Sequence, residues 1–257
     1  DFVTTRLFNK NAVGPELVGA CEALVAQVEP SRLAELFIGG ILKQDIDFPS
    51  AHQSLLWDSL GPEDFLLTPL PNHLFQRDNS AWIYSGVSIN PMARTARKRE
   101  IIHSRAIWNF HPTLAVSPEQ IWQGDDDAPH EPATIEGGDI LTIGNGAIMV
   151  GLSERTTAQG ISKLAHSLFA DPAGQTTKII VVELPRERAF MHLDTAMTMV
   201  DRDAFSIYPY LSQDLRSWTL EKKDDGGDYR LTQNVALAPV VANALGLDAV
   251  RVLQTPI

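Results

Sequence analysis

The N-terminal part of the chain repeats apolar residues at the spacing of an α-helix. The segment PELVGACEALVAQVE puts one apolar stripe on a helix, formed by Leu17, Cys21, Leu24 and Val28. Helical patterns also fit SRLAELFIGGILKQ, with Ser31 as its N-cap, and the shorter HQSLLWDSL. We therefore expect a helical domain, and the stripe favours Cys21 as a packed core thiol over a nucleophile.

The pattern changes at the proline-punctuated segment 62–71, which we interpret as a domain boundary. Beyond it come short strands joined by tight turns, such as the turn GNGA, whose residues suit positive φ angles. The sequence thus predicts a helical domain over residues 1–62 and an α/β domain over residues 63–257.

The second part repeats one unit three times. Each copy begins with two short strands, in QRDNSAWIYSGVSI, IEGGDILTIGNGAIMVG and MHLDTAMTMVDRDAFSIY. Helical segments follow, in MARTARKREIIHSRAIW, RTTAQGISKLAHSLFA and, after a longer connection containing DDGG, VALAPVVANALG. With the strand-like KIIVVEL and AVRVLQT, each unit is predicted to be strand, strand, helix, strand.

Titratable residues recur in the frame of this repeat. Asp78, Glu136 and His192 each stand at the start of a unit, at nearly equal intervals. Arg97 and Arg155 follow Asp78 and Glu136 at one identical interval, near the starts of their helices. Since equivalent positions of modules around an axis converge, we expect one shared site, with the arginines at its mouth.

The composition of the chain limits the kinds of partner that it can bind. The formal net charge of −11 argues against a nucleic-acid partner, because phosphate binding needs clustered Lys and Arg. No apolar run approaches the roughly 20 residues that span a bilayer, and no signal-peptide pattern opens the chain. A cytoplasmic protein without membrane partners is the expectation. The single cysteine excludes an intrachain disulfide and a multi-cysteine metal site.

Each polar motif alone has a plain structural interpretation. RDN fits a surface turn, EGGD a bulge, and HLD a satisfied core histidine; only their common register makes them notable. A metal site is disfavoured because no HxxxH or HxH pair is present. Instead, Asp78, Glu136, His192 and Asp194 form an anionic floor that suits a guanidinium, and the two arginines suit a carboxylate.

These segments resemble a known family. PLPNHLFQRDNSAWIYSGVSINPMARTARKRE, IEGGDIL with GLSERTTAQG, and MHLDTAMTMVDRD are similar, in order and spacing, to arginine deiminases of the guanidino-group-modifying pentein superfamily. The resemblance implies an α/β propeller of five modules, of which three are recognised here. The leading helices resemble the insertion that arginine deiminases carry and that dimethylarginine hydrolases and amidinotransferases lack.

The resemblance implies hydrolysis of L-arginine to L-citrulline and ammonia without metal or cofactor. Asp78 and Asp194 would hold the guanidinium, His192 would act as general acid and base, and Glu136 would set the protonation of His192. Substrate-binding roles fall, by the same resemblance, to Arg97, Arg155, Asn72, the Phe75 backbone and Asp139. Whether the protein forms a homo-oligomer stays open.

One departure from the family pattern is the nucleophile. The family uses a cysteine near its C-terminus, whereas the sequence ends in LQTPI and has only Cys21. Two interpretations follow. The chain is part of a longer deiminase with further segments at both ends, or it is a nucleophile-free homologue that binds arginine or another partner without catalysis.

Overall fold

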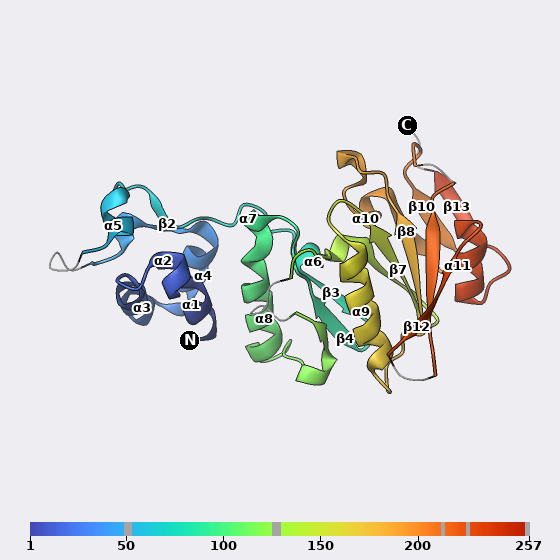
Figure 1. The fold of residues 1–257 in the computed structure, drawn as a ribbon, viewed down its shortest axis with the longest axis horizontal. Helices are drawn as coiled ribbons and strands as arrows, with labels where there is room; N and C mark the ends of the chain where they lie inside the picture. Colours follow the sequence, from blue (N-terminus) through green and yellow to red (C-terminus); the bar gives the residue numbers. More distant parts are fainter. Residues whose placement is uncertain (49–52, 125–129, 212–213, 225–226, 255–257) are drawn as a thin grey trace. The chain divides into compact units, whose positions relative to one another are not determined.

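The computed structural model describes residues 1–48, 53–124, 130–211, 214–224 and 227–254 (Figure 1). The chain forms two compact units, Asp1–Leu74 and Phe75–Ile257. The sequence placed the division after residue 62. The structure places it later, because the strand Phe65–Leu67 (β2) pairs with Ile41–Leu42 (β1) and so belongs to the first unit.

The first unit is mainly helical. Its helices are α1 (Phe2–Leu7), α2 (Lys10–Val13), α3 (Val18–Gln27), α4 (Pro30–Gly39) and α5 (Leu55–Ser59). Helix α4 begins one residue before the predicted N-cap, because Pro30 has the φ that suits a first helical position. It ends where Gly40 adopts φ 96°, so ILKQ forms β1 and the first residues of a 3-10 turn (Lys43–Asp45) rather than helix.

Cys21 lies on α3 with no solvent exposure. Burial, followed by the nearby charge of Glu22, raises the pKa of its thiol to about 11. At neutral pH the residue is therefore a protonated core thiol, as its apolar stripe predicts.

The second unit contains the predicted succession of elements three times. The first copy is the hairpin β3 (Ser80–Ile83) and β4 (Gly86–Ile89), helices α7 (Thr95–Lys98) and α8 (Glu100–Phe110), and strand β5 (Ile121–Gln123). The second is β6 (Ile140–Gly144), β7 (Ala147–Leu152), α9 (Ala158–Ala170) and β8 (Lys178–Glu183). The third is β9 (Met197–Asp201), β10 (Ala204–Ile207), α11 (Leu237–Leu245) and β13 (Arg251–Gln254).

In each copy the hairpin is antiparallel and the strand after the helix returns parallel to the second hairpin strand. This is the expected result of a helical crossover. The described strands lie in separate open sheets of an α/β fold, and the closed five-module propeller stays a prediction.

One hairpin was missed by the sequence analysis. The long connection after β10 contains β11 (Ser217–Lys222) and β12 (Tyr229–Gln233). Strand β11 pairs with β8, which extends the middle sheet to the order β12-β11-β8-β7-β6. In the sequence the hairpin lies within the third copy, between β10 and α11, but its strands extend the sheet of the second copy.

The middle sheet carries the core. Strands β7 and β8 are apolar on both faces, as parallel strands covered on both sides require. Ile148 and Ile179 pack with residues of α9, including Leu164, whereas Met149 packs with residues of α11, including Val241. Figure 1 shows α9 and α11 on opposite sides of these strands.

A short helical turn precedes the first strand of every copy. These turns are α6 (Gln76–Asn79), a 3-10 turn (Gly137–Asp139) and α10 (Leu193–Ala196). The prediction that MHLDTAMTMVDRDAFSIY starts with a strand is therefore wrong for its first residues: His192 is the N-cap of α10, Asp194 lies within it, and the strand begins at Met197.

Helix α9 approaches the chain before it so closely that Gly160 has no room for a side chain. A Cβ at this position would lie 2.1 Å from the carbonyl oxygen of Thr134. We expect Gly160→Ala to lower the free energy of unfolding by about 2–3 kcal/mol, because overpacking against backbone forces a shift.

Gly19 in α3 is the matched control, since a Cβ there meets nothing within 4 Å. Gly19→Ala should raise stability by about 0.5–1 kcal/mol through the helix preference of alanine. Chemical denaturation of both variants checks the pair, and equal effects would contradict the close approach at Gly160.

Candidate active site

The three helical turns that precede the modules bring their polar residues together. Asp78 lies in α6, Glu136 is the N-cap of the 3-10 turn, and His192 is the N-cap of α10. The Nε2 atom of His192 lies 2.8 Å from Oε2 of Glu136, and its Nδ1 lies 3.6 Å from Oδ1 of Asp78. The common register of these residues in the sequence thus corresponds to one cluster in space.

His192 is a buried imidazole between two carboxylates, with 6% of its surface exposed. Burial by itself lowers the pKa of His192. The hydrogen bond with Glu136 and the charges of Asp139, Asp78 and Glu136 outweigh burial, so the pKa is raised above its ordinary value. The arrangement therefore favours the imidazolium, which can donate a proton, near neutral pH.

Asp139 fixes the start of α10. Its Oδ1 accepts a hydrogen bond from the Leu193 backbone N–H at 2.9 Å, and its Oδ2 accepts from the hydroxyls of Ser153 and Thr156 at 2.7 and 2.6 Å. Burial raises the pKa of Asp139 to about 6 against these hydrogen bonds. These hydrogen bonds favour the carboxylate against the effect of burial, and the carboxylate positions the peptide next to His192.

Gly138 allows the turns to approach one another. A Cβ at this position would lie 2.7 Å from Nδ1 of His192 and 3.0 Å from Oδ1 of Asp78. The second glycine of EGGD is therefore a requirement of the cluster, because any side chain would push the imidazole away from Asp78.

Arg97 lies inside the protein rather than at an exposed mouth. Its Nε and Nη2 donate to both carboxylate oxygens of Glu100 at 2.9 Å, and its Nη1 donates to Oδ2 of Asp78 at 2.6 Å. Nη2 also donates to the Phe75 carbonyl at 3.0 Å. Burial opposes the charge, but the hydrogen bonds and charges of Glu100 and Asp78 raise the pKa of Arg97, so the guanidinium stays charged.

Arg155 keeps donors that the described protein does not use. Its side chain is only 13% exposed, and its Nε lies 3.8 Å from Glu154, beyond hydrogen-bond distance. The buried Nε atom has no hydrogen-bond partner, and Nη2 reaches only the sulfur of Met191 at 3.6 Å. Burial lowers the pKa of Arg155, and the charge of Glu136 counteracts this. This guanidinium is well suited to receive an anion.

Asp194 is the most accessible carboxylate of the cluster. Its side chain is 31% exposed and lies 3.7 Å from Nε of Arg77. Burial raises its pKa, while the charges of His192 and Arg77 lower it. Among the residues that the structure describes, no group of three or more His, Cys, Asp and Glu could hold a metal ion.

Comparison with known proteins identifies the family of this chain. A model of the family "Arginine deiminase" matches residues 4–257. The chain belongs to the arginine deiminase family. Within the described residues no helix is long and apolar enough to cross a membrane.

Several solved structures are similar to this chain at low sequence identity. Dimethylarginine dimethylaminohydrolase from Pseudomonas aeruginosa, complexed with citrulline, has 17% identity and a TM-score of 0.42, over 74% of this chain and 72% of that chain. An adduct of dimethylarginine dimethylaminohydrolase with 4-chloro-2-hydroxymethylpyridine has 20% identity and a TM-score of 0.41, over 56% and 52%. This chain therefore spans about half of the latter protein.

Inosamine-phosphate amidinotransferase from Streptomyces griseus has 13% identity and a TM-score of 0.40, over 96% of this chain and 61% of that chain.

The substrate contacts that the resemblance implies for Phe75 and Asn72 both stay predictions. The Phe75 carbonyl belongs to the cluster through Arg97. Asn72 lies in the first unit, and its contact with a substrate stays a prediction.

Three partners in the cluster were missed by the sequence analysis of this deiminase-family chain. Glu100 is fully buried against Arg97, and Ser153 and Thr156 bind Asp139. Glu100 could have been found, because it follows Arg97 by three positions on a helix-forming segment. The two hydroxyl residues offer no such signal, since serine and threonine are common in turns.

Replacing Glu136 should lower the pKa of His192. In Glu136→Gln the hydrogen-bonded negative charge is lost, and burial of the imidazole then dominates. NMR titration of the His192 ring protons measures this change. Glu183→Gln, in an exposed pair with Arg216, should leave the titration of His192 unchanged. A His192 pKa that stays or rises in Glu136→Gln would contradict the assignment.

The same coupling predicts a pH dependence of stability. Because the folded-state pKa of His192 is raised above 6.5, its protonated ring stabilises the fold fully below that value, and this contribution is lost as pH rises through the folded pKa. The stability difference between wild type and Glu136→Gln should therefore shrink over that range.

Burial should make the ion pair Arg97–Glu100 contribute far more to the stability of the fold than an exposed ion pair does. Arg32–Glu35 has the same residue types and spacing but is 63% and 66% exposed, against 8% and 0% for Arg97–Glu100. We expect Glu100→Gln to cost about 3 kcal/mol, since it leaves a buried cation partly unpaired, and Glu35→Gln to cost under about 1 kcal/mol. Equal losses in urea denaturation would refute this.

Proposed function

We propose that this chain supplies the guanidinium-binding and acid–base groups of an arginine deiminase, which hydrolyses L-arginine to L-citrulline and ammonia. The observation that carries the proposal is His192, buried between Glu136 and Asp78 within a cluster of carboxylates. A cluster of this charge suits a planar cation with several N–H donors. Membership of the arginine deiminase family supports the same substrate.

In the proposed complex the substrate lies between the carboxylates and Arg155. Asp194 and Asp78 accept hydrogen bonds from the guanidinium nitrogens, Asp194 through its partly exposed carboxylate. The α-carboxylate of the substrate binds Arg155, whose Nε makes no hydrogen bond in the described protein. Arg97 acts differently in this proposal, since Asp78 and Glu100 already neutralise it, and it orients Asp78.

The reaction requires a thiolate, which attacks the guanidinium carbon to form a C–S bond. The C–N bond to one terminal nitrogen then breaks, and the His192 imidazolium protonates that nitrogen, so ammonia leaves. Neutral His192 next takes a proton from water. The resulting hydroxide adds to the amidino carbon and the C–S bond breaks, which releases the thiolate. The hydroxyl proton passes through solvent to the released ammonia, so the ureido group of citrulline and ammonium result. The raised pKa of His192 supports the first proton transfer.

We assign the thiolate to a polypeptide segment outside these 257 residues. Cys21 is unsuited to the role, because it is fully buried in the first unit and its pKa is raised to about 11. The same observation favours a second candidate, a nucleophile-free member of the family that binds arginine without turnover.

Two measurements separate these candidates. Protein purified from its natural source should have a mass above 28.3 kDa and should release citrulline from L-arginine, with activity reduced by several orders of magnitude in His192→Ala. A mass of 28.3 kDa without citrulline release would overturn the enzyme and leave the binding protein.

Calorimetry tests arginine binding in either case. Arg155→Ala should weaken binding about tenfold or more, because a charge-assisted hydrogen bond is lost. Arg202→Ala, at an exposed position outside the cluster, is the control and should bind like wild type. Unchanged affinity in Arg155→Ala would exclude its role at the carboxylate, and no arginine binding at all would overturn both candidates.

A further inference from the structure

An ion pair joins the first and second modules next to Arg155. Arg94, the N-cap of α7, pairs through its Nη2 with Oε1 of Glu154, which follows β7. The same oxygen of Glu154 lies 3.8 Å from Nε of Arg155. One carboxylate oxygen therefore lies between two guanidinium groups: it is paired with Arg94 and is beyond hydrogen-bond distance of Arg155.

Both ends of this pair are attached to the cluster around His192. The backbone N–H of Ala93, the residue before the arginine of the pair, donates to Oε1 of Glu136 at 3.1 Å. The hydroxyl of Ser153, the residue before the glutamate of the pair, donates to Oδ2 of Asp139 at 2.7 Å. Because each partner follows a residue that is bound to the cluster, the pair lies at the edge of the candidate active site.

The charges of the pair act on Arg155. Burial lowers the pKa of Arg155, the charge of Glu136 counteracts this, and the charge of Arg94 lowers the pKa further. The Nε atom of Arg155 is buried without a hydrogen-bond partner, so an additional carboxylate there would be favourable. The Glu154 oxygen at 3.8 Å would need to move by only about 1 Å to accept a hydrogen bond from it.

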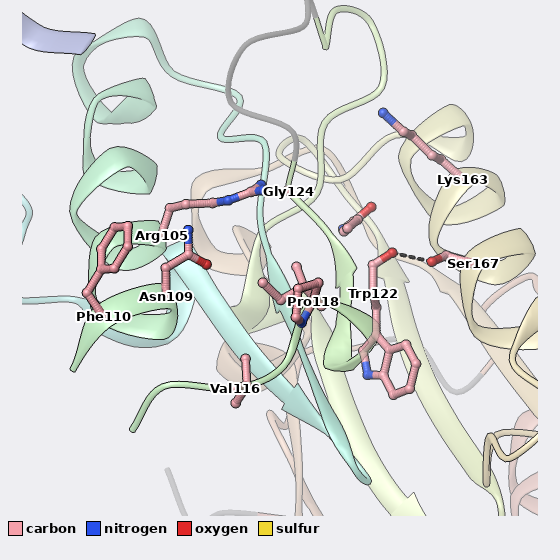
Figure 2. A pocket seen from close by; sticks show the side chains of 11 residues that line it. Arg105, Asn109, Phe110, Val116, Pro118, Trp122, Gly124, Lys163 and Ser167 are labelled. Carbon is pink, nitrogen blue, oxygen red and sulfur yellow. Dashed lines mark hydrogen bonds between the residues drawn. The ribbon is translucent and has the colours of Figure 1, made fainter. Parts of the chain in front are cut away.

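The pair is not required to hold the two modules together. The side chains of Arg94 and Glu154 are 57% and 34% exposed, and exposed ion pairs contribute little to stability. Other contacts join the same modules. The hydroxyl of Tyr84 donates to the Ala147 carbonyl at 2.8 Å, and Figure 2 shows Ser167 of α9 bonded to the carbonyl of a β5 residue, Trp122. Loss of the pair should therefore leave the fold intact.

We propose that Arg94 is a positioning residue that holds Glu154 away from Arg155 and so keeps the Arg155 guanidinium available to the α-carboxylate of the substrate. Glu154 carries the same charged group as that end of the substrate, and it is an internal competitor for the same donors. This inference rests on the proposed function, in which Arg155 binds the α-carboxylate. The preference of the site for a ligand with a carboxylate thus depends on the pair.

Calorimetric titration of the whole chain tests the role of Arg94. Arg94→Ala should weaken binding of L-arginine about fivefold, because Glu154 then pairs with Arg155. L-Argininamide has an uncharged amide in place of the carboxylate and does not use the contested donor. It should bind Arg94→Ala no more weakly than it binds the wild type.

A double variant distinguishes competition from a direct contact. Arg94→Ala/Glu154→Gln removes the competing charge as well, so its affinity for L-arginine should return to within about twofold of wild type. No such rescue is expected if Arg94 contacts the substrate itself or only supports the fold. Arg251→Ala is the control, because its arginine is similarly exposed and pairs with Asp201 and Asp203 in the third module. It should bind L-arginine like wild type.

The outcomes separate this inference from the proposed function. If Arg155→Ala weakens binding of L-arginine but Arg94→Ala does not, the proposed function stands and the role of Arg94 is refuted. A double variant as weak as Arg94→Ala alone refutes the competition in the same way. If the wild type does not bind L-arginine, the proposed function fails and this inference fails with it.

Discussion

The interaction on which the second unit depends is the pairing of charges that its module starts bury together. His192, Glu136 and Asp78 come from three separate modules, and each would be costly to bury alone. The interaction of the protonated imidazole with the two carboxylates offsets part of that cost. The guanidinium of Arg97 pairs with the other carboxylate oxygen of Asp78. The three modules are thus held by electrostatics at the point where their apolar hairpins begin.

This arrangement also explains the local backbone. On a strand the side chains of His192 and Asp194 would point to the same face. In the helical turn the Leu193 N–H donates to Asp139, and Asp194 lies near Arg77. The Gly-Gly pair of EGGD is part of the same arrangement, since Gly138 leaves room for the imidazole of His192 and for Asp78. The charged groups can therefore pair only because the backbone of the turns approaches closely.

The sequence made the repeat and the clustering of Asp78, Glu136 and His192 predictable, because both follow from spacing. Local geometry was not predictable from spacing. MHLDTAMTMVD has strand-like composition, yet its first residues form a turn because Asp139, distant in sequence, caps Leu193. The hairpin β11–β12 was missed for a similar reason: its strand β11 gains a partner, β8, from another module. Tertiary contacts decided both cases, and no pattern within the segments records them.

Arg97 and Arg155 show how equal positions in a repeat acquire different chemistry. Both follow a module start by the same interval, but Arg97 has Glu100 three residues later, whereas Arg155 has Ala158. On a helical segment residues i and i+3 lie next to each other, so Glu100 binds the Arg97 guanidinium through both oxygens. Without that carboxylate Arg155 keeps an unused donor in a buried place. Arg97 also lies within helix α7, whereas Arg155 lies outside a helix, before the start of α9, so the glutamate and the local backbone together distinguish the two guanidinium groups.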